Sequence, residues 1–210
     1  MSLHDDRKEY QLDQLDDGAK SLNPIILFEK WLENYRQSGV ADATAFALST
    51  VGEDGTPDAR IVLLKELSEG SLIFYTHYSS KKGRDLAFHP QAHALFFWRE
   101  MERQIRISGS VIQVPSEKSD AYFASRPTGS QRGAMASNQS AAVASRSVME
   151  EKFEAQGAIP DEALQRPQLW GGYALRIERI EFWQGRPSRM HDRIAYTLKD
   201  HRWEAQRLEP

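Results

Sequence analysis

The amino-acid sequence predicts a mainly β protein with peripheral helices (α+β), in which antiparallel strands form a closed or nearly closed barrel. Three observations support this fold class. Short runs with the composition of strands recur along the chain, and turn signals such as Asp54-Gly55 and Glu69-Gly70 separate them. No internal repeat or domain-sized linker interrupts the series. The 210 residues are 40% hydrophobic, with five Trp and nine Phe, which is enough for one packed core.

The first third of the chain predicts an arm, a helix and three strands. Residues 1–22 are polar and lack an apolar period, so we expect a mobile arm followed by a single domain over residues 23–210. Asn23 and Pro24 give an N-cap and a first-turn proline, and apolar residues then recur at helical spacing until Gly39. Three strands in a meander are expected next, over residues 44–51, 59–67 and 71–76.

The rest of the chain alternates between helices and strands. Three helices are expected, over residues 80–89, 116–125 and 147–156. Ser116 is a plausible cap for the second, and Arg126-Pro127 should end it. Residues 134–147 are rich in Ala and Ser, a composition that by itself indicates a flexible linker. Residues 156–166 should connect the last helix to the sheet. Strands are expected over residues 92–98, 104–114, 172–184, 193–198 and 203–208.

Composition and charge exclude several classes of function. The formal net charge of −3 is unlike that of a general binder of nucleic acids or membrane surfaces, so any basic patch should be specific. Cysteine is absent, which excludes disulfides, thiolate catalysis and Cys-based metal centres. The first ten residues lack the apolar core of a signal peptide, and no stretch reaches the length of a membrane span. We therefore expect a cytoplasmic protein.

Residues 182–193 contain the pattern most suggestive of a binding site. Arg189, His191 and Arg193 recur at a spacing of two, so in an extended chain their side chains would line one face, near Trp183. Exposed charge pairs contribute little stability, which favours an anion-binding face over a structural role. The alternative is a solvated polar face of an edge strand.

Other patterns indicate that side chains would have to hold any bound phosphate and that a cofactor would supply the chemistry. No Gly-rich dinucleotide or P-loop motif is present. Lys81 and Lys82 stand at a helix start, where their ammonium groups and backbone N–H groups could converge on one anion. Pro90 interrupts any shared helix face between His89 and His93, so no metal site is assigned. No nucleophile elbow or carboxylate pair is present, which leaves chemistry to a bound cofactor.

Nine segments carry a resemblance to a known family, in order and over nearly the whole chain. Examples are Arg-Ile-Val-Leu-Leu-Lys, Trp-Gly-Gly-Tyr and Arg-Met-His-Asp-Arg. The segments are residues 60–65, 74–76, 80–82, 102–106, 122–131, 136–140, 170–173, 181–185 and 189–193. Together they resemble the pyridoxine/pyridoxamine 5′-phosphate oxidases. The resemblance implies an FMN-binding split β-barrel, antiparallel and Greek-key-like, and a homodimer with FMN at the subunit interface.

The activity that the resemblance implies is oxidation of pyridoxamine 5′-phosphate and pyridoxine 5′-phosphate to pyridoxal 5′-phosphate. Hydride would pass to FMN, which dioxygen would reoxidise to give hydrogen peroxide. Two alternatives remain open. One is a related split-barrel FMN oxidase for another small aromatic substrate, such as those of phenazine synthesis. The other is a protein that binds flavin or pyridoxal 5′-phosphate without turnover.

The resemblance also implies roles for individual residues. Cofactor binding is assigned to Arg60, Ile61, Val62, Leu63, Leu64, Lys65, Tyr75, Thr76, Lys81, Lys82, Gln104, Gln139, Ser140, Trp183 and Arg193. Substrate binding is assigned to Arg7, Tyr10, Lys65, Tyr122, Arg126, Ser130, Arg189 and His191. Within the second set, Lys65, Tyr122, Arg126 and Ser130 would hold the phosphate. Arg189 and His191 would flank the reacting ring as the catalytic pair, and Arg7 and Tyr10 would close over it. Gln139 and Ser140 argue against a flexible linker in the Ala/Ser-rich run.

Two positions depart from the family pattern. Ser80-Lys81-Lys82-Gly83 stands where the family usually has Ser-Arg-Lys-Ala, and Arg132 stands where it usually has Ile. A lysine cannot reproduce the two-pronged grip of a guanidinium, so we expect Lys81 to bind the FMN phosphate more weakly than an arginine would. No dedicated general base can be identified from the sequence.

Overall fold

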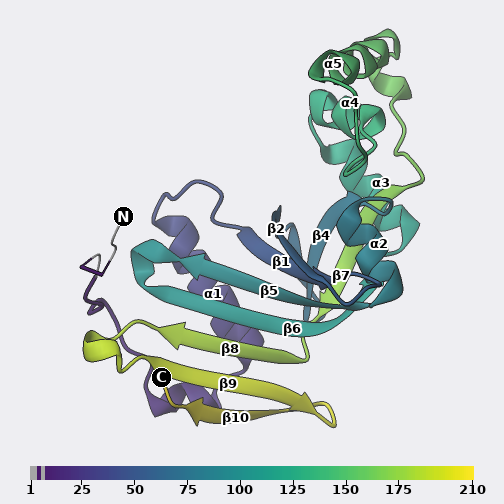
Figure 1. The fold of residues 1–210 in the computed structure, drawn as a ribbon. Coiled ribbons are helices and arrows are strands. Elements are labelled where there is room, and N and C mark those ends of the chain that lie inside the picture. The colour runs from purple at the N-terminus through teal and green to yellow at the C-terminus, as the bar shows by residue number, and fades with distance from the viewer. Residues whose placement is uncertain (1–3, 6–7) are drawn as a thin grey trace.

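Two antiparallel sheets that share one long strand form the body of the protein (Figure 1). The computed structural model describes residues 4–5 and 8–210. Its strands are β1 (Ala45–Val51), β2 (Pro57–Leu63), β3 (Glu66–Ser68), β4 (Ser71–His77), β5 (Gln91–Trp98), β6 (Arg103–Gln113), β7 (Trp170–Arg176), β8 (Arg179–Gln184), β9 (Asp192–Lys199) and β10 (Arg202–Leu208). The larger sheet has the order β10-β9-β8-β6-β5-β1-β2, and the smaller sheet joins β3, β4 and β7 to β6.

Strand β6 belongs to both sheets. Its first part, residues 103–108, pairs with β8, and its last part, residues 111–113, pairs with β7. The expected pairing of the first three strands is confirmed, because residues 57–63 pair with β1 and residues 66–68 pair with β4, but the strand expected over residues 59–67 is divided into β2 and β3, one in each sheet. The single strand expected over residues 172–184 is likewise two strands, one in each sheet. Apolar alternation continues through the corner between them, so it does not reveal the change of sheet.

Helices lie around the sheets as the sequence predicts, with some different boundaries. They are α1 (Pro24–Gln37), α2 (Lys81–Phe88), α3 (Ser116–Ser125), α4 (Thr128–Ala136) and α5 (Arg146–Ala155). The Asn23 side chain accepts a hydrogen bond from the Ile25 N–H at 2.9 Å, which confirms the predicted N-cap. Ser116 is instead the first helical residue and makes no capping hydrogen bond. Short 3-10 turns are η1 (Asp17–Ser21), η2 (Arg99–Met101), η3 (Gln156–Ala158), η4 (Asp161–Ala163) and η5 (Pro187–Arg189).

Helix α1 covers the inner face of the larger sheet. Phe28 packs edge-on against Phe96 with 5.2 Å between ring centroids, and Trp31 packs in the same way against Phe182 at 5.2 Å. The core extends into the segment before the helix, since Leu15 and Ala19 are buried. Residues before position 23 thus contribute to the packed core in this structure. Two apolar residues four positions apart are too few to show this in the sequence.

Helices α4 and α5 project away from the sheets (Figure 1). Helix α4 follows Pro127 at once and takes up part of the run expected to be a linker. Its two glycines, Gly129 and Gly133, hide its helical character, because glycine is a poor helix former. None of the helices in the described part of the chain is long and apolar enough to cross a membrane.

Candidate active site

A cavity of about 470 Å³ opens where β2, β4, α2 and the α3–α4 junction meet. We call it the cation cavity. Most residues predicted to bind the cofactor or the phosphate of the substrate line it. The lining consists of Ile61, Val62, Leu63, Lys65, Tyr75, Thr76, Lys82, Tyr122, Arg126, Pro127, Ser130, Gln139 and Trp170. The structure thus brings together segments that lie more than a hundred residues apart in the chain.

Aromatic rings form one wall of the cation cavity. Tyr122 stacks on Tyr75 with 3.9 Å between ring centroids, and Trp170 stacks on Tyr75 at 5.6 Å. Burial raises the pKa of Tyr75 to about 12, so its hydroxyl stays protonated at neutral pH. The guanidinium of Arg126 lies over Trp170, with 4.7 Å from its central carbon to the ring centroid. This contact holds the arginine against the wall.

The charges in the cation cavity are all positive. Lys65, Lys82 and Arg126 line it, and no aspartate or glutamate of the described residues does. Lys82 is only 7% exposed, and its ammonium lies 3.3 Å from Thr76 Oγ1 and from Gln139 Oε1, with no carboxylate of the described residues at ion-pair distance. Nη1 of Arg126 is buried without a hydrogen-bond partner. Burial lowers the pKa of both groups. Buried cations normally have a counter-charge, so this cavity fits an anion.

Gln139 connects the Ala/Ser-rich run to the cavity. Its side-chain oxygen accepts hydrogen bonds from Thr76 Oγ1 at 2.8 Å and from the His77 N–H at 3.4 Å. Ser140 has a left-handed backbone with φ of 68° and lines a neighbouring cavity of about 370 Å³, which Gln139 also borders. This part of the run is therefore fixed by specific contacts.

Apart from Ser140 and the residues on β6, β8 and β9, three residues predicted to bind the cofactor lie outside the cation cavity. Arg60 donates to Thr50 Oγ1 at 2.8 Å and to Asp58 at 2.6 Å, and Leu64 is buried in the core. Lys81 forms an ion pair with Asp85 at 2.7 Å. Although burial opposes ionisation, hydrogen bonds from Lys81 and Thr50 hold the pKa of Asp85 below its usual value. The predicted convergence of Lys81 and Lys82 is wrong, because successive helical residues point about 100° apart.

The remaining predicted residues gather at the ends of β6, β8 and β9. We call Tyr10, Gln104, Trp183, Arg189, His191 and Arg193 the hairpin group. Trp183 lies opposite Gln104 on β6 and Arg193 on β9. The ring of Tyr10 lies 5.7 Å from that of Trp183 and 5.8 Å from that of His191, measured between centroids. Arg7, which was predicted to act beside Tyr10, lies outside the described residues.

The expected strand face with Arg189, His191 and Arg193 does not form. Strand β9 begins at Asp192, and Arg189 belongs to η5 with φ of 61°. The left-handed backbone at Arg189 and at Ser188 breaks the alternation of side chains. Arg193 alone lies on the strand, and its guanidinium donates to Glu181 Oε1 at 2.8 and 2.9 Å. Two adjacent left-handed non-glycine residues are rare, so local sequence does not predict them.

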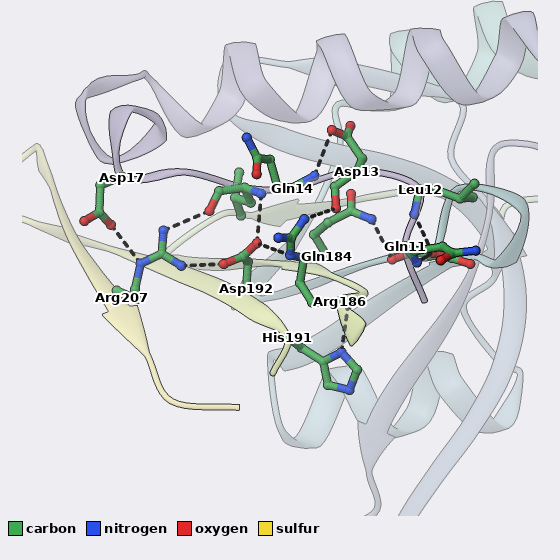
Figure 2. A network of polar contacts seen from close by, with 12 residues as sticks. Gln11, Leu12, Asp13, Gln14, Asp17, Gln184, Arg186, His191, Asp192 and Arg207 are labelled. Carbon is green, nitrogen blue, oxygen red and sulfur yellow. Dashed lines mark hydrogen bonds and ion pairs between the residues drawn. The ribbon is translucent and has the colours of Figure 1, made fainter. Parts of the chain in front are cut away.

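His191 is held in one protonation form. The backbone N–H of Arg186 donates to its Nδ1 at 3.1 Å (Figure 2). Burial, together with the nearby charge of Arg189, lowers the pKa of His191, which favours the neutral ring. A neutral ring whose Nδ1 accepts a hydrogen bond carries its proton on Nε2. His191 therefore presents an N–H donor at Nε2.

The cation cavity and the hairpin group are separate within one chain. Strands β1, β5 and β6 lie between β2, at the cavity, and β8, which carries Trp183. Four strand spacings correspond to roughly 19 Å. The cavity also contains residues that were not predicted, chiefly Trp170. The Trp-Gly-Gly-Tyr segment was the sequence signal that could have indicated Trp170. Its glycines leave room for the cavity wall, since a Cβ atom on Gly172 would lie 2.8 Å from the ring of Tyr75.

The departure at Arg132 has a structural explanation. Its guanidinium donates to the Ile159 carbonyl at 2.8 Å and to Asp161 at 2.5 Å, and it also contacts the Gln156 carbonyl. These bonds join α4 to the connection after α5. Arg132 therefore stabilises the projecting helices instead of lining the cavity.

Family models match most of the chain. Residues 33–157 match pyridoxamine 5′-phosphate oxidase, and residues 170–210 match the pyridoxine 5′-phosphate oxidase C-terminal dimerisation region. Two curated relatives are the pyridoxine/pyridoxamine 5′-phosphate oxidases of Actinobacillus succinogenes and Nostoc sp. The first is 45% identical to this chain, and the match covers 100% of both proteins. The second is 46% identical, and the match covers 100% of this chain and 99% of the relative.

Solved structures have the same fold. PhzG from Burkholderia lata, in complex with tetrahydrophenazine-1-carboxylic acid, has a TM-score of 0.87 and 29% identity, over 95% of this chain and 99% of PhzG. A pyridoxamine 5′-phosphate oxidase-related, FMN binding protein from Nostoc punctiforme has a TM-score of 0.73 and 18% identity, over 91% and 100%. The second likeness supports the fold alone.

Together these findings define the class of protein, an FMN-binding oxidoreductase with a split-barrel fold. The expected fold, cofactor and enzyme class are confirmed. The chain belongs to the pyridoxine/pyridoxamine 5′-phosphate oxidase family. The cation cavity fits the phosphate that FMN carries, because its buried cations lack a counter-charge.

Proposed function

We propose that the protein oxidises pyridoxamine 5′-phosphate and pyridoxine 5′-phosphate to pyridoxal 5′-phosphate. The observation that supports this most is the cation cavity, where Arg126 has a buried nitrogen without a partner and Lys65 and Lys82 add positive charge. Cofactor and substrate each carry a phosphate. Charge-assisted hydrogen bonds from guanidinium and ammonium groups suit both.

The residues of the cavity divide into two roles in this proposal. Lys82, Thr76 and Gln139 contact one another in the cavity and would hold FMN. Lys65, Tyr122, Arg126 and Ser130 would hold the phosphate of the substrate. A phosphate held in this way fixes the pyridine ring in one pose, which is the orientation that hydride transfer requires.

The bound cofactor would accept hydride from the substrate carbon and pass the electrons to dioxygen, giving hydrogen peroxide. The alcohol substrate loses two hydrogens to become the aldehyde, and the amine also takes up water and releases ammonia. His191 would orient the reacting substituent by donating from Nε2. Arg189 would add positive charge beside it.

We also propose that the active form is a homodimer, in which the hairpin group of one chain faces the cation cavity of the other. The separation of the two groups by three strands supports this arrangement. The match of residues 170–210 to a dimerisation region supports it too. Light scattering should give twice the 24.0 kDa of one chain, and an active monomer would contradict the proposal.

A second candidate function follows from the likeness to PhzG. A carboxylate on a reduced phenazine is also an anion that could enter the cation cavity. The number of buried cations favours a phosphate, which carries more negative charge than a carboxylate. A protein that binds flavin or pyridoxal 5′-phosphate without turnover is the third possibility.

One assay separates these functions. The protein loaded with FMN is given pyridoxamine 5′-phosphate, pyridoxamine and tetrahydrophenazine-1-carboxylic acid in parallel, and peroxide release is measured. We expect turnover with the phosphorylated amine, and at least tenfold lower kcat/KM with the other two. Turnover of the phenazine alone would support the second function, and no peroxide from any substrate would support a binding protein.

A further inference from the structure

The segment before α1 runs beside the hairpin group and is fastened by hydrogen bonds to residues that adjoin it, such as Asp192 and Arg186 (Figure 2). Tyr10 sits in this segment and packs edge-on against Trp183 and His191. The Tyr10 side chain makes no hydrogen bond to the described residues, and the ammonium of Lys8, which Glu102 also holds, lies 5.7 Å from its ring centroid. Its position therefore depends on whatever fixes the backbone around it.

Glu102 fixes that backbone. Its Oε2 accepts hydrogen bonds from the N–H groups of Gln11 at 2.8 Å and Leu12 at 3.1 Å. Its Oε1 pairs with the ammonium of Lys8 at 2.9 Å. Glu102 is only 2% exposed, so its carboxylate depends on these partners for the hydrogen bonds that water would otherwise supply. One buried carboxylate thus holds the chain on both sides of Tyr10.

The backbone of Glu102 supports a functional role for its side chain. Its φ of 53° and ψ of 39° are left-handed, a conformation that glycine adopts more easily. Its carbonyl accepts from the Gly185 N–H at 2.7 Å, which joins this turn to the end of β8 beside Trp183. Glycine would adopt this backbone conformation at a lower cost in free energy. The presence of a glutamate here therefore indicates that its carboxylate has a function.

Gly185 provides the surface on which Tyr10 lies. A Cβ atom built on Gly185 would be 2.7 Å from Cγ of Tyr10 and 3.1 Å from Cβ of Glu102. The first distance is too short for two non-bonded carbon atoms, so the Tyr10 ring would have to move. The second distance is close to the shortest that non-bonded carbon atoms adopt. The absence of a side chain at Gly185 therefore lets Tyr10 approach Trp183 and His191.

We propose that Glu102 is a positioning residue for the oxidation. Its carboxylate sets Tyr10 against Trp183 and His191 by holding the N–H groups of Gln11 and Leu12, and Gly185 leaves the space that this placement needs. The inference rests on the proposed function for its catalytic consequence. The anchoring itself can be measured without any activity.

Hydrogen exchange of the FMN-loaded protein tests the anchoring. Glu102→Gly removes the carboxylate and suits the left-handed backbone, whereas Glu102→Gln keeps an oxygen that can accept from both N–H groups. Exchange at residues 11 and 12 should rise at least about tenfold in Glu102→Gly and less than about threefold in Glu102→Gln. Glu100→Gln is the matched control, because Glu100 lies in the same turn but accepts from the Tyr35 hydroxyl. Unchanged exchange in Glu102→Gly would overturn the proposal.

Kinetics with pyridoxamine 5′-phosphate test the consequence. Glu102→Gly should raise KM about tenfold, with FMN affinity and kcat within about twofold, and Glu102→Gln should restore most of the loss. Added to Tyr10→Ala, Glu102→Gly should cause no further rise, because both changes remove the same contact. Fully additive effects would overturn the proposal.

Gly185→Ala tests the placement without a change in charge. It should raise KM by a similar factor while exchange at residues 11 and 12 rises less than in Glu102→Gly, and an unchanged KM would overturn the role of Gly185. If the wild-type protein does not oxidise pyridoxamine 5′-phosphate, the proposed function fails. The exchange results then still decide whether Glu102 anchors the segment.

Discussion

The cation cavity and the hairpin end of the larger sheet are both rich in basic side chains, but they use them differently. At the hairpin end each of several arginines has an acidic partner: Arg193 pairs with Glu181, Arg103 with Asp13, and Arg207 with Asp17 and Asp192. In the cation cavity, Lys82 and Arg126 have none among the described residues. Basic groups with carboxylate partners hold the chain together. Basic groups without them are available for a ligand, so the pairing pattern distinguishes structural from binding residues.

The largest expected effect concerns the paired region. Glu181 is 1% exposed and accepts from Arg193, with Arg179 at 3.2 Å and Arg106 at 3.6 Å. Glu181→Ala would leave three arginines without their shared counter-charge. Glu181 is buried, but the three guanidinium groups are 24–41% exposed and stay partly hydrated, so the free energy of unfolding should fall by about 2 to 3 kcal/mol. Urea denaturation of the FMN-free protein measures this. A change below about 1 kcal/mol would mean that the pairing is not structural.

Arg126→Ala should affect substrate binding and leave stability almost unchanged, in contrast to Glu181→Ala. Its guanidinium has no hydrogen-bond partner to lose, so stability should hardly change, whereas binding of phosphorylated substrate should weaken roughly ten- to a hundredfold. FMN content should stay normal. Steady-state kinetics on pyridoxamine 5′-phosphate beside pyridoxamine check this, because only the phosphorylated substrate should be affected. An equal loss for both amines would remove Arg126 as the phosphate anchor.

Lys82 provides a test by pH. Burial lowers its pKa, with Arg60 nearby as a second cause, below the ordinary value of 10.5. Between the lowered pKa and 10.5 the unfolded chain binds more protons than the folded one, so in that window Lys82 makes the FMN-free protein more stable as pH rises. FMN affinity should fall over the same window, because the neutral amine attracts phosphate less.

Lys82→Met should remove both pH effects and weaken FMN binding about tenfold at pH 7. Fluorescence titration with FMN at several pH values measures the affinity, and thermal unfolding of the FMN-free protein measures stability. Lys20→Met, which changes an exposed surface lysine, is the control. If FMN affinity in Lys82→Met is unchanged at pH 7, Lys82 does not contact the cofactor.

The smallest effect is expected at Lys81. Lys81→Arg should raise FMN affinity only about two- to threefold, because Lys81 already pairs with Asp85 outside the cavity and an arginine would add only a second hydrogen-bonding prong. The same titration checks this. Unchanged or poorer affinity would show that Lys81 is not a ligand of the FMN phosphate.

Local patterns were sufficient to predict most elements of the fold. The N-cap at Asn23, the turn at Asp54-Gly55 and the alternation along β5 and β6 each act over a few residues, and the structure confirms the elements that they indicate. The sharing of β6 between two sheets could not be predicted in this way. It depends on which strands meet in space, and the alternation of buried and half-buried side chains continues along β6 whichever neighbour is present.

In the candidate site, too, some placements were predicted from the sequence and others were not. The resemblance of the chain to a family predicted most of the residues that line the cation cavity, and the structure brings them together. The spacing of Arg189, His191 and Arg193 predicted a strand, but the left-handed backbone at Ser188 and Arg189 gives a turn. That backbone forms in the presence of contacts from distant residues, such as Glu9 to the Ser188 N–H. The pairing of Lys81 with Asp85 is different, because it is an i, i+4 contact within one helix that the sequence does show. The bond from Arg60 to Thr50 depends instead on the pairing of β1 with β2.

The three strands between β2 and β8 have a genetic consequence. If each active site draws its cavity from one chain and its hairpin group from the other, two chains with different defects can complement each other. Mixing Arg126→Ala chains with His191→Ala chains would produce mixed dimers with one site free of both substitutions. Random pairing would then restore about a quarter of the wild-type sites. Two recessive alleles, one that alters the cation cavity and one that alters the hairpin group, would therefore rescue one another, whereas two alleles that alter the same group would not.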